Sequence, residues 1–177
     1  MHRFFRTIAA ARGKYAKRDL AMFRVMCAKG MRTSEVTQLQ LDDYSQRDNT
    51  LRVRRLKGSR SGVYPMHKAE GASLRAYLRE RGDAPGAMFL SRHGRGVSRR
   101  QRDRLMKFYG RIAGLPRQKC HAHVLKHTRG TQLHEAGEDI LMIQHELGHR
   151  EIRNTQHYTH ISAGAKKAQH ERNRDKW

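Results

Sequence analysis

Residues 123–160 read HVLKHTRGTQLHEAGEDILMIQHELGHREIRNTQHYTH, and helices separated by short turns are expected within them. Apolar residues recur at helical spacing, and the glycines and polar residues between them are typical of helix ends. The same stretch holds several histidines and a tyrosine, which are residue types of metal sites and of nucleophilic sites. The spacing predicts helices over about His123–Ala136, Asp139–Leu147 and Ile152–Tyr158.

One interpretation of this stretch is a zinc site. His145, Glu146 and His149 form the H-E-x-x-H pattern of helical zinc proteases. That site needs a helix that continues through the second histidine, but Gly148 is typical of a helix end. A third ligand at the extended spacing would fall on Thr155, which is a poor zinc ligand. We therefore expect His145 and Glu146 on a solvated helix surface and no metal.

The charge of the chain points to a polyanionic partner. The 177 residues include 38 Lys+Arg and 16 Asp+Glu, so the net charge is 38 − 16 = +22, and the sequence pI is about 11.1. Nucleic acid is the leading candidate. An anionic membrane surface is the alternative, but the basic residues spread along the whole chain, and no apolar run of about 18 residues predicts a spanning helix. Cys27 and Cys120 form no disulfide pattern and fit a reducing cytosol.

The rest of the chain predicts more helices and a small sheet, in one domain. The other expected elements are a helix that ends at Gly30, a short helix capped by Thr33 or Ser34 with Glu35 in its first turn, a β-hairpin over residues 51–66, and a helix closed by Gly82. The predicted fold class is therefore mainly α with a small antiparallel β-sheet (α+β).

A capping box at Ser98 and Gln101 predicts a further helix that ends at Gly114. Its side chains expected to face inward are Leu105, Phe108 and Ile112, and those expected outward are Arg99, Arg100, Arg102, Arg104, Lys107 and Arg111.

Three segments in their order resemble the catalytic domain of tyrosine site-specific recombinases, the phage integrase family. They are GMRTSEVTQLQLDD (residues 30–43), RRLKGSRSGVYPM (residues 54–66) and residues 123–160, in which LGH stands nine residues before a tyrosine. The segments RLKGS, FLSRHGRGVSRRQ and LGHREIRNT also resemble the short fimbrial phase-switch invertases.

The resemblance covers about residues 16–162 and implies the recombinase catalytic-domain fold there. It implies a basic N-terminal extension at residues 1–15 and a basic C-terminal tail at residues 163–177 that is exchanged between subunits. The family usually carries an N-terminal DNA-clamping domain, so the chain is expected to be a separated catalytic domain or a naturally short member.

The resemblance also implies the catalytic residues. The first arginine falls on Arg32, the hairpin lysine on Lys57, the two histidines on His123 and His149, and the nucleophile on Tyr158. Arg32 and His149 would stabilise the charge of the transition state, Lys57 would protonate the leaving 5′-oxygen, and His123 would accept the phenolic proton or donate to an oxygen. Each residue also has a plain structural alternative: a backbone phosphate contact, an ordinary hairpin lysine, a helix cap, or a core tyrosine.

One position departs from the family. The family's second arginine is Lys126 here, in His123-Val-Leu-Lys126, and a lysine lacks the planar fork that binds two oxygens. Lys126 either supplies the missing charge or is a bystander that Arg129 replaces. We expect Arg99, Arg100 and Arg129 to contact DNA phosphates.

The function implied is site-specific recombination through a 3′-phosphotyrosine, in DNA integration, excision or inversion, with no cofactor. The alternatives are a catalytically weakened DNA-binding relative and a tyrosine-type topoisomerase. The expected partner is double-stranded DNA, on which the chain forms a homotetramer although it is monomeric alone. The expected location is the bacterial, archaeal or phage-infected cytoplasm, at the nucleoid.

Overall fold

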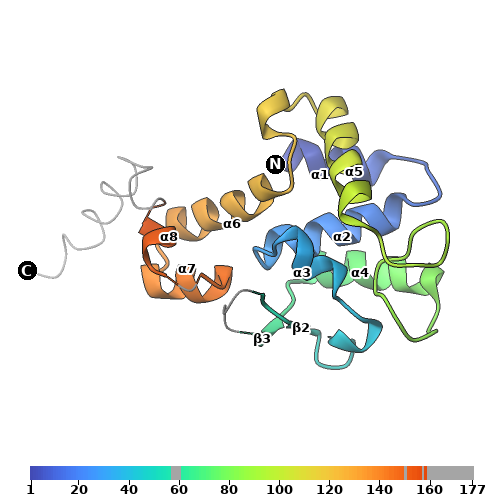
Figure 1. Ribbon diagram of the computed structural model, residues 1–177, viewed down its shortest axis with the longest axis horizontal. Helices are drawn as coiled ribbons and strands as arrows, with labels where there is room; N and C mark the ends of the chain where they lie inside the picture. Colours follow the sequence, from blue (N-terminus) through green and yellow to red (C-terminus); the bar gives the residue numbers. More distant parts are fainter. Residues whose placement is uncertain (57–60, 150, 157, 159–177) are drawn as a thin grey trace, which may run out of the picture.

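The computed structural model describes residues 1–56, 61–149, 151–156 and 158, so Lys57 and the C-terminal tail lie outside the described residues. Most of the described chain is helical (Figure 1). The helices are α1 (His2–Ala10), α2 (Ala16–Ala28), α3 (Thr33–Thr37), α4 (Lys68–Arg81), α5 (Arg99–Ile112), α6 (His123–Glu135), α7 (Ile140–Leu147) and α8 (Arg153–Gln156), with 3-10 helices η1 (Leu41–Asp43) and η2 (Arg117–Lys119).

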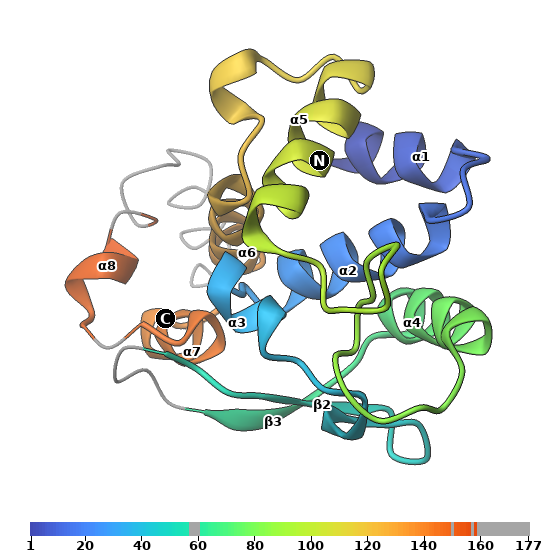
Figure 2. The same ribbon diagram turned by 45° about the vertical axis from the view of Figure 1, so that its right-hand side comes forward.

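The expected hairpin is confirmed as part of an antiparallel sheet. Its strands are β1 (Tyr44–Ser45), β2 (Thr50–Val53) and β3 (Gly62–Pro65), in the order β1-β2-β3. Leu51 pairs with Tyr64, and Val53 pairs with Gly62. Leu51 and Val53 are fully buried, whereas Arg52 between them is exposed, as strand alternation requires. Figure 2 shows the hairpin end of this sheet beside α7.

Helix α2 lies at the centre of the core and contacts α1, α4 and α6. Helix α1 belongs to this core, whereas we expected only a basic N-terminal extension at residues 1–15. Phe4 and Ile8 of α1 are fully buried, and the Phe4 ring meets the Phe23 ring of α2 edge-on, with centroids 5.4 Å apart. These contacts anchor the N-terminal residues to the rest of the domain.

The inward face predicted for α5 is wrong except at Leu105, which packs against the core. Phe108 and Ile112 are 57% and 60% exposed, whereas Met106 and Tyr109 are buried. Arg102, predicted to face outward, is fully buried and donates to the Val97 carbonyl over 2.7 Å. The buried stripe is offset by about one residue from the predicted stripe, because the surfaces that cover α5, from α1 and α3, choose the face.

A second, smaller hydrophobic cluster joins the C-terminal helices. It consists of Leu133 of α6, Ile143 and Leu147 of α7, and Tyr158. Helix α6 therefore links the main core to the end of the molecule that carries α7 and α8 (Figure 1). Among the described residues, no helix is both long and apolar enough to cross a membrane.

Candidate active site

Arg32 stands at the N-terminus of α3 and is held by Glu35. One oxygen of the buried Glu35 carboxylate accepts from the Arg32 backbone N–H over 2.8 Å, and the other lies 3.0 Å from Arg32 Nη1. The N-cap of α3 is thus Arg32, not Thr33 or Ser34, because the carboxylate of Glu35 satisfies the free backbone donor. The Arg32 side chain is 31% exposed, so its guanidinium can still reach a ligand.

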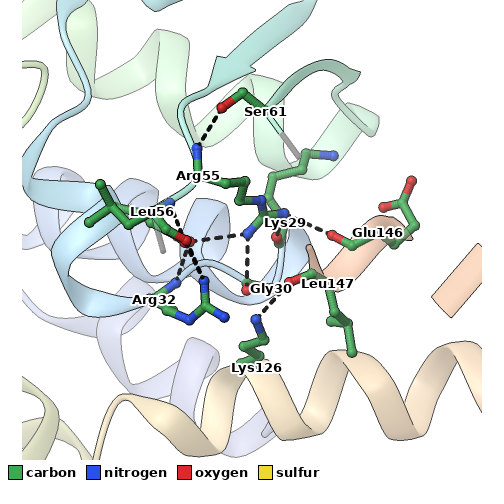
Figure 3. A network of polar contacts seen from close by, with 10 residues as sticks. Lys29, Gly30, Arg32, Arg55, Leu56, Ser61, Lys126, Glu146 and Leu147 are labelled. Carbon is green, nitrogen blue, oxygen red and sulfur yellow. Dashed lines mark hydrogen bonds and ion pairs between the residues drawn. The ribbon is translucent and has the colours of Figure 1, made fainter. Parts of the chain in front are cut away.

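Lys126 lies close to the same centre. It points from α6 toward the end of α7, where Nζ donates to the Leu147 carbonyl over 2.6 Å (Figure 3). Burial first, and then the charges of Arg32 and Arg55, lower its pKa to about 7. The lysine therefore lies within the electrostatic range of Arg32, and it gives up its proton more readily than an exposed lysine does.

His149 follows directly after the end of α7. Gly148 adopts the left-handed conformation, with φ 59° and ψ 42°, and ends the helix as the sequence predicted. The His149 Nδ1 atom lies 3.0 Å from the Thr155 hydroxyl. Burial first, and then the charges of Lys126 and Arg32, lower the pKa of His149 to about 3, so its imidazole is neutral.

The end of α7 also separates the two histidines of the H-E-x-x-H pattern. Helix α7 stops at Leu147, so His149 does not continue the helix face that carries His145. His145 is exposed, as predicted, and its ring lies 6.3 Å from the Tyr64 ring. Glu146 is only half-exposed. Among the described residues, no three His, Cys, Asp or Glu side chains gather closely enough to hold a metal ion.

Tyr158 is 3% exposed and packs between histidines and α6. Its ring is parallel to that of His149, with centroids 6.4 Å apart. It lies so close to Gly130 that a Cβ atom there would overlap the ring. Burial raises the pKa of Tyr158, so the phenol is protonated and needs an acceptor before it can attack.

That acceptor position is occupied by a histidine to which sequence reasoning gave no role. His127 Nδ1 lies 3.3 Å from the Tyr158 hydroxyl, and the His127 ring meets the His123 ring edge-on with centroids 4.7 Å apart. Burial, then the charges of His127 and Lys126, lowers the pKa of His123. A signal was available in the sequence, because His123 and His127 are four residues apart and therefore share a face of α6.

Arg55 is a second residue that sequence reasoning missed. Its side chain is fully buried, and its guanidinium binds Glu35 and three backbone carbonyls. The available signal was strand alternation, because position 55 continues the inward series of Leu51 and Val53 and so places an arginine at a core position.

The remaining predicted residues either lie apart from this centre or fall outside the described residues. Lys57 is not described, although the carbonyl of its neighbour Leu56 accepts from Arg32 Nη1 over 3.3 Å. Arg99 and Arg100 are exposed on α5. Arg129 faces α2 instead: its Nε is buried and makes no hydrogen bond to the described residues, and its charge opposes the rise in the Cys27 pKa that burial causes.

Comparison with known proteins now identifies this arrangement. Residues 3–164 match the Phage integrase family. The chain belongs to that family. It is 35% identical over 160 residues to the type 1 fimbriae regulatory protein FimE of Escherichia coli K12, a match that covers 88% of this chain and 80% of FimE. It is 34% identical over 160 residues to the tyrosine recombinase XerD of Proteus mirabilis, covering 87% of this chain and 51% of XerD.

Solved structures agree on the fold. The crystal structure of XerA recombinase superposes with a TM-score of 0.81 at 25% identity, over 99% of this chain and 62% of the XerA chain. XerH site-specific recombinase bound to its difH substrate gives a TM-score of 0.76 at 24% identity, over 90% of this chain and 48% of XerH. The predicted fold class and the resemblance to both recombinases and fimbrial invertases are confirmed. The chain is thus a tyrosine recombinase that acts on DNA.

Proposed function

We propose that this chain cuts and rejoins DNA at specific sites through a covalent 3′-phosphotyrosine on Tyr158. The proposal rests on one observation: distant segments bring a phenol, histidines and cationic side chains together. A protonated phenol lies against His127 and His149, and the cations Arg32 and Lys126 surround the same centre. Such donors are needed where a phosphodiester gathers negative charge during attack.

The chemistry balances without a cofactor. The Tyr158 oxygen forms a bond to phosphorus, and the bond to the 5′-oxygen breaks. The phenolic proton passes to a neutral histidine, either His127, which lies 3.3 Å away, or its neighbour His123. Lys57 supplies a proton to the leaving 5′-oxygen. Rejoining reverses these steps with a new 5′-hydroxyl.

Three donors would hold the phosphate during this reaction. Arg32 presents a planar fork, and neutral His149 donates one hydrogen bond. Lys126 gains a proton as the phosphate arrives, because an anion raises the pKa of a nearby ammonium. Since Tyr158 is only 3% exposed, its ring must turn away from Gly130 before the hydroxyl meets DNA.

A second candidate function rests on the low pKa of Lys126. A lysine with a lowered pKa and no planar fork stabilises a phosphoryl transition state less than an arginine does. This favours the alternative of a DNA-binding relative with weakened catalysis.

The wider assembly is also proposed from the family. The chain acts as a homotetramer on double-stranded DNA, with residues 163–177 passed to a neighbouring subunit, in integration, excision or inversion. Arg99 and Arg100 contact phosphates, whereas Arg129, with its buried Nε and its charge beside Cys27, is not proposed for this role. The location that follows from this substrate is the cytoplasm, at the nucleoid.

The test uses a pool of nicked duplexes with randomised sequence around the nick. Cleavage releases a short strand, so the enzyme is trapped on the DNA and runs as a larger band on a denaturing gel. Sequencing the trapped DNA gives the preferred site. We expect adducts in the presence of a chelator, since no metal is required. Salt-dependent binding without any adduct would favour the weakened relative.

A further inference from the structure

The side chain of Arg55 donates four hydrogen bonds beside the candidate active site (Figure 3). Nη2 donates to the carbonyls of Lys29 over 2.7 Å and of Glu146 over 2.8 Å. Nη1 donates to the Gly30 carbonyl over 3.3 Å and to Glu35 Oε2 over 3.2 Å. The side chain is 0% exposed, so these groups bind it without competition from solvent.

These bonds join Arg55 to two segments that each carry a proposed catalytic group. Lys29 and Gly30 lead into Arg32, and Glu35 binds Arg55 with one oxygen and Arg32 Nη1 with the other. Glu146 lies three residues before His149 in the chain. A single rigid guanidinium therefore spans the segments of Arg32 and His149.

The backbone of Arg55 also bonds the other side of the hairpin. Its N–H donates to the hydroxyl of Ser61, the residue before β3, over 3.0 Å. Lys57, the proposed general acid, follows Arg55 by two residues in the sequence.

The end of α7 is fitted closely against this arginine. A Cβ atom on Gly148 would lie 2.9 Å from Arg55 Nε, and one on Gly30 would lie 2.5 Å from Leu147 Cδ2. Arg55 and Lys126 bind the consecutive carbonyls of Glu146 and Leu147, where a helix C-terminus attracts cations. The position of α7 relative to α3 is therefore set by Arg55 together with these close contacts.

We propose that Arg55 is a positioning residue that fixes the spacing of Arg32 and His149 around the phosphate. The proposal rests on the function proposed above. Arg55 is buried and touches no substrate, so it acts through the residues it binds. A displacement of about 1 Å in a catalytic group lowers rates by about a hundredfold, so loss of this anchor affects the chemical step more than DNA binding.

Its neighbour offers a matched control. Arg54 Nη1 lies 2.6 Å from the buried carboxylate of Asp43, so Arg54→Gln also removes one positive charge and one partner of a buried carboxylate from the same segment. The Arg54 side chain is 48% exposed, and its carboxylate partner is on η1, not on α3. Arg54→Gln thus matches the charge change of Arg55→Gln without removing a bond to the segments that carry Arg32 and His149.

The experiment compares Arg55→Gln, Arg55→Lys and Arg54→Gln with the unchanged protein on the trapped DNA site. For each protein we measure the melting temperature, the DNA Kd and the single-turnover cleavage rate at saturating DNA. Arg55→Gln should cleave about a hundredfold more slowly with little change in Kd. Arg55→Lys keeps the charge beside Glu35 but loses the fork, so it should stay folded and also be slow. Arg54→Gln should cleave at the normal rate.

The outcomes separate this inference from the proposed function. If the unchanged protein forms adducts and both Arg55 variants cleave as fast as Arg54→Gln, the positioning role is wrong and the recombinase function stands. The same holds if the loss lies only in Kd, or follows the melting temperature across all three variants. If Arg55→Gln does not fold, Arg55→Lys alone decides. If the unchanged protein forms no adduct, the proposed function fails and this inference fails with it.

Discussion

The proposed function depends on the hydroxyl of Tyr158, which is the proposed nucleophile. Tyr158→Phe removes one oxygen and leaves the ring packed against Gly130 and His149. We expect the variant to bind DNA with nearly normal affinity and to form no covalent adduct. The denaturing gel measures the adduct, and a filter-binding titration measures affinity. Adducts formed by the phenylalanine variant would rule out Tyr158 as the nucleophile.

Single substitutions also decide whether Lys126 or Arg129 takes the role of the family's second arginine. Lys126 lies among the charges of the site, whereas Arg129 faces α2 and Cys27. We therefore expect Lys126→Ala to slow single-turnover cleavage by about a hundredfold, as for loss of a preorganised donor. Lys126→Arg should keep or raise the rate. The reverse pattern, with a tolerated Lys126→Ala and an inactive Arg129→Ala, would assign the role to Arg129.

The pKa of Lys126 predicts a pH dependence of binding. In the free protein that pKa is lowered to about 7, and a bound phosphate raises it. At pH values between the free and the bound pKa, Lys126 therefore takes up a proton when DNA binds. Below about pH 7 the lysine is already protonated and affinity is constant; above it, affinity falls as pH rises. His149, with a pKa of about 3, does not titrate in this window.

The measurement is the Kd of Tyr158→Phe for the selected site from neutral to mildly alkaline pH. The Tyr158→Phe, Lys126→Arg double variant serves as the control, because arginine stays protonated throughout and its Kd should not change. Equal pH dependence in both proteins would mean that Lys126 does not take up the proton.

At the scale of elements, the end of α7 is the critical junction. Gly148 has φ +59°, and a Cβ atom there would also press on Arg55. Gly82, which ends α4, has φ +75° and open space around it. Alanine at either position introduces backbone strain of about 1–3 kcal/mol. Only Gly148→Ala should also slow cleavage, because it alone pushes the α7 end away from Arg55.

Thermal unfolding and single-turnover cleavage of both glycine variants check this prediction. A comparable fall in melting temperature with a selective loss of cleavage in Gly148→Ala is the expected result. Equal cleavage rates in Gly148→Ala and Gly82→Ala would show that the α7 end tolerates displacement.

At the scale of the whole molecule, the net charge of +22 governs DNA binding. Each neutralised phosphate contributes about −0.9 to the slope of log K against log salt. We expect a steep negative slope. Arg99→Gln and Arg100→Gln should each make the slope shallower, by up to about 0.9. Titrations of affinity against salt measure both. A slope near zero would contradict an electrostatic interface, and unchanged slopes would remove these two arginines from it.

Local sequence determined the elements and much of the site. Gly30, Gly82 and Gly148 end helices where expected, because glycine adopts positive φ without strain. Alternation in residues 51–66 gave the hairpin. The order and spacing of the motifs gave the family, and they selected Arg32, Lys126, His149 and Tyr158, which the fold gathers around one centre.

Only the tertiary structure decided how those residues are surrounded. Periodicity gives the spacing of an apolar stripe but not which neighbour covers it, so the buried face of α5 was misplaced and Arg102 was expected in solvent. The pKa values of Lys126 and His149 depend on burial and on charges from segments far apart in the chain. Arg55 binds Glu146 across 91 positions of sequence, and no local pattern specifies such a bond, because it forms only after separate helices have packed together.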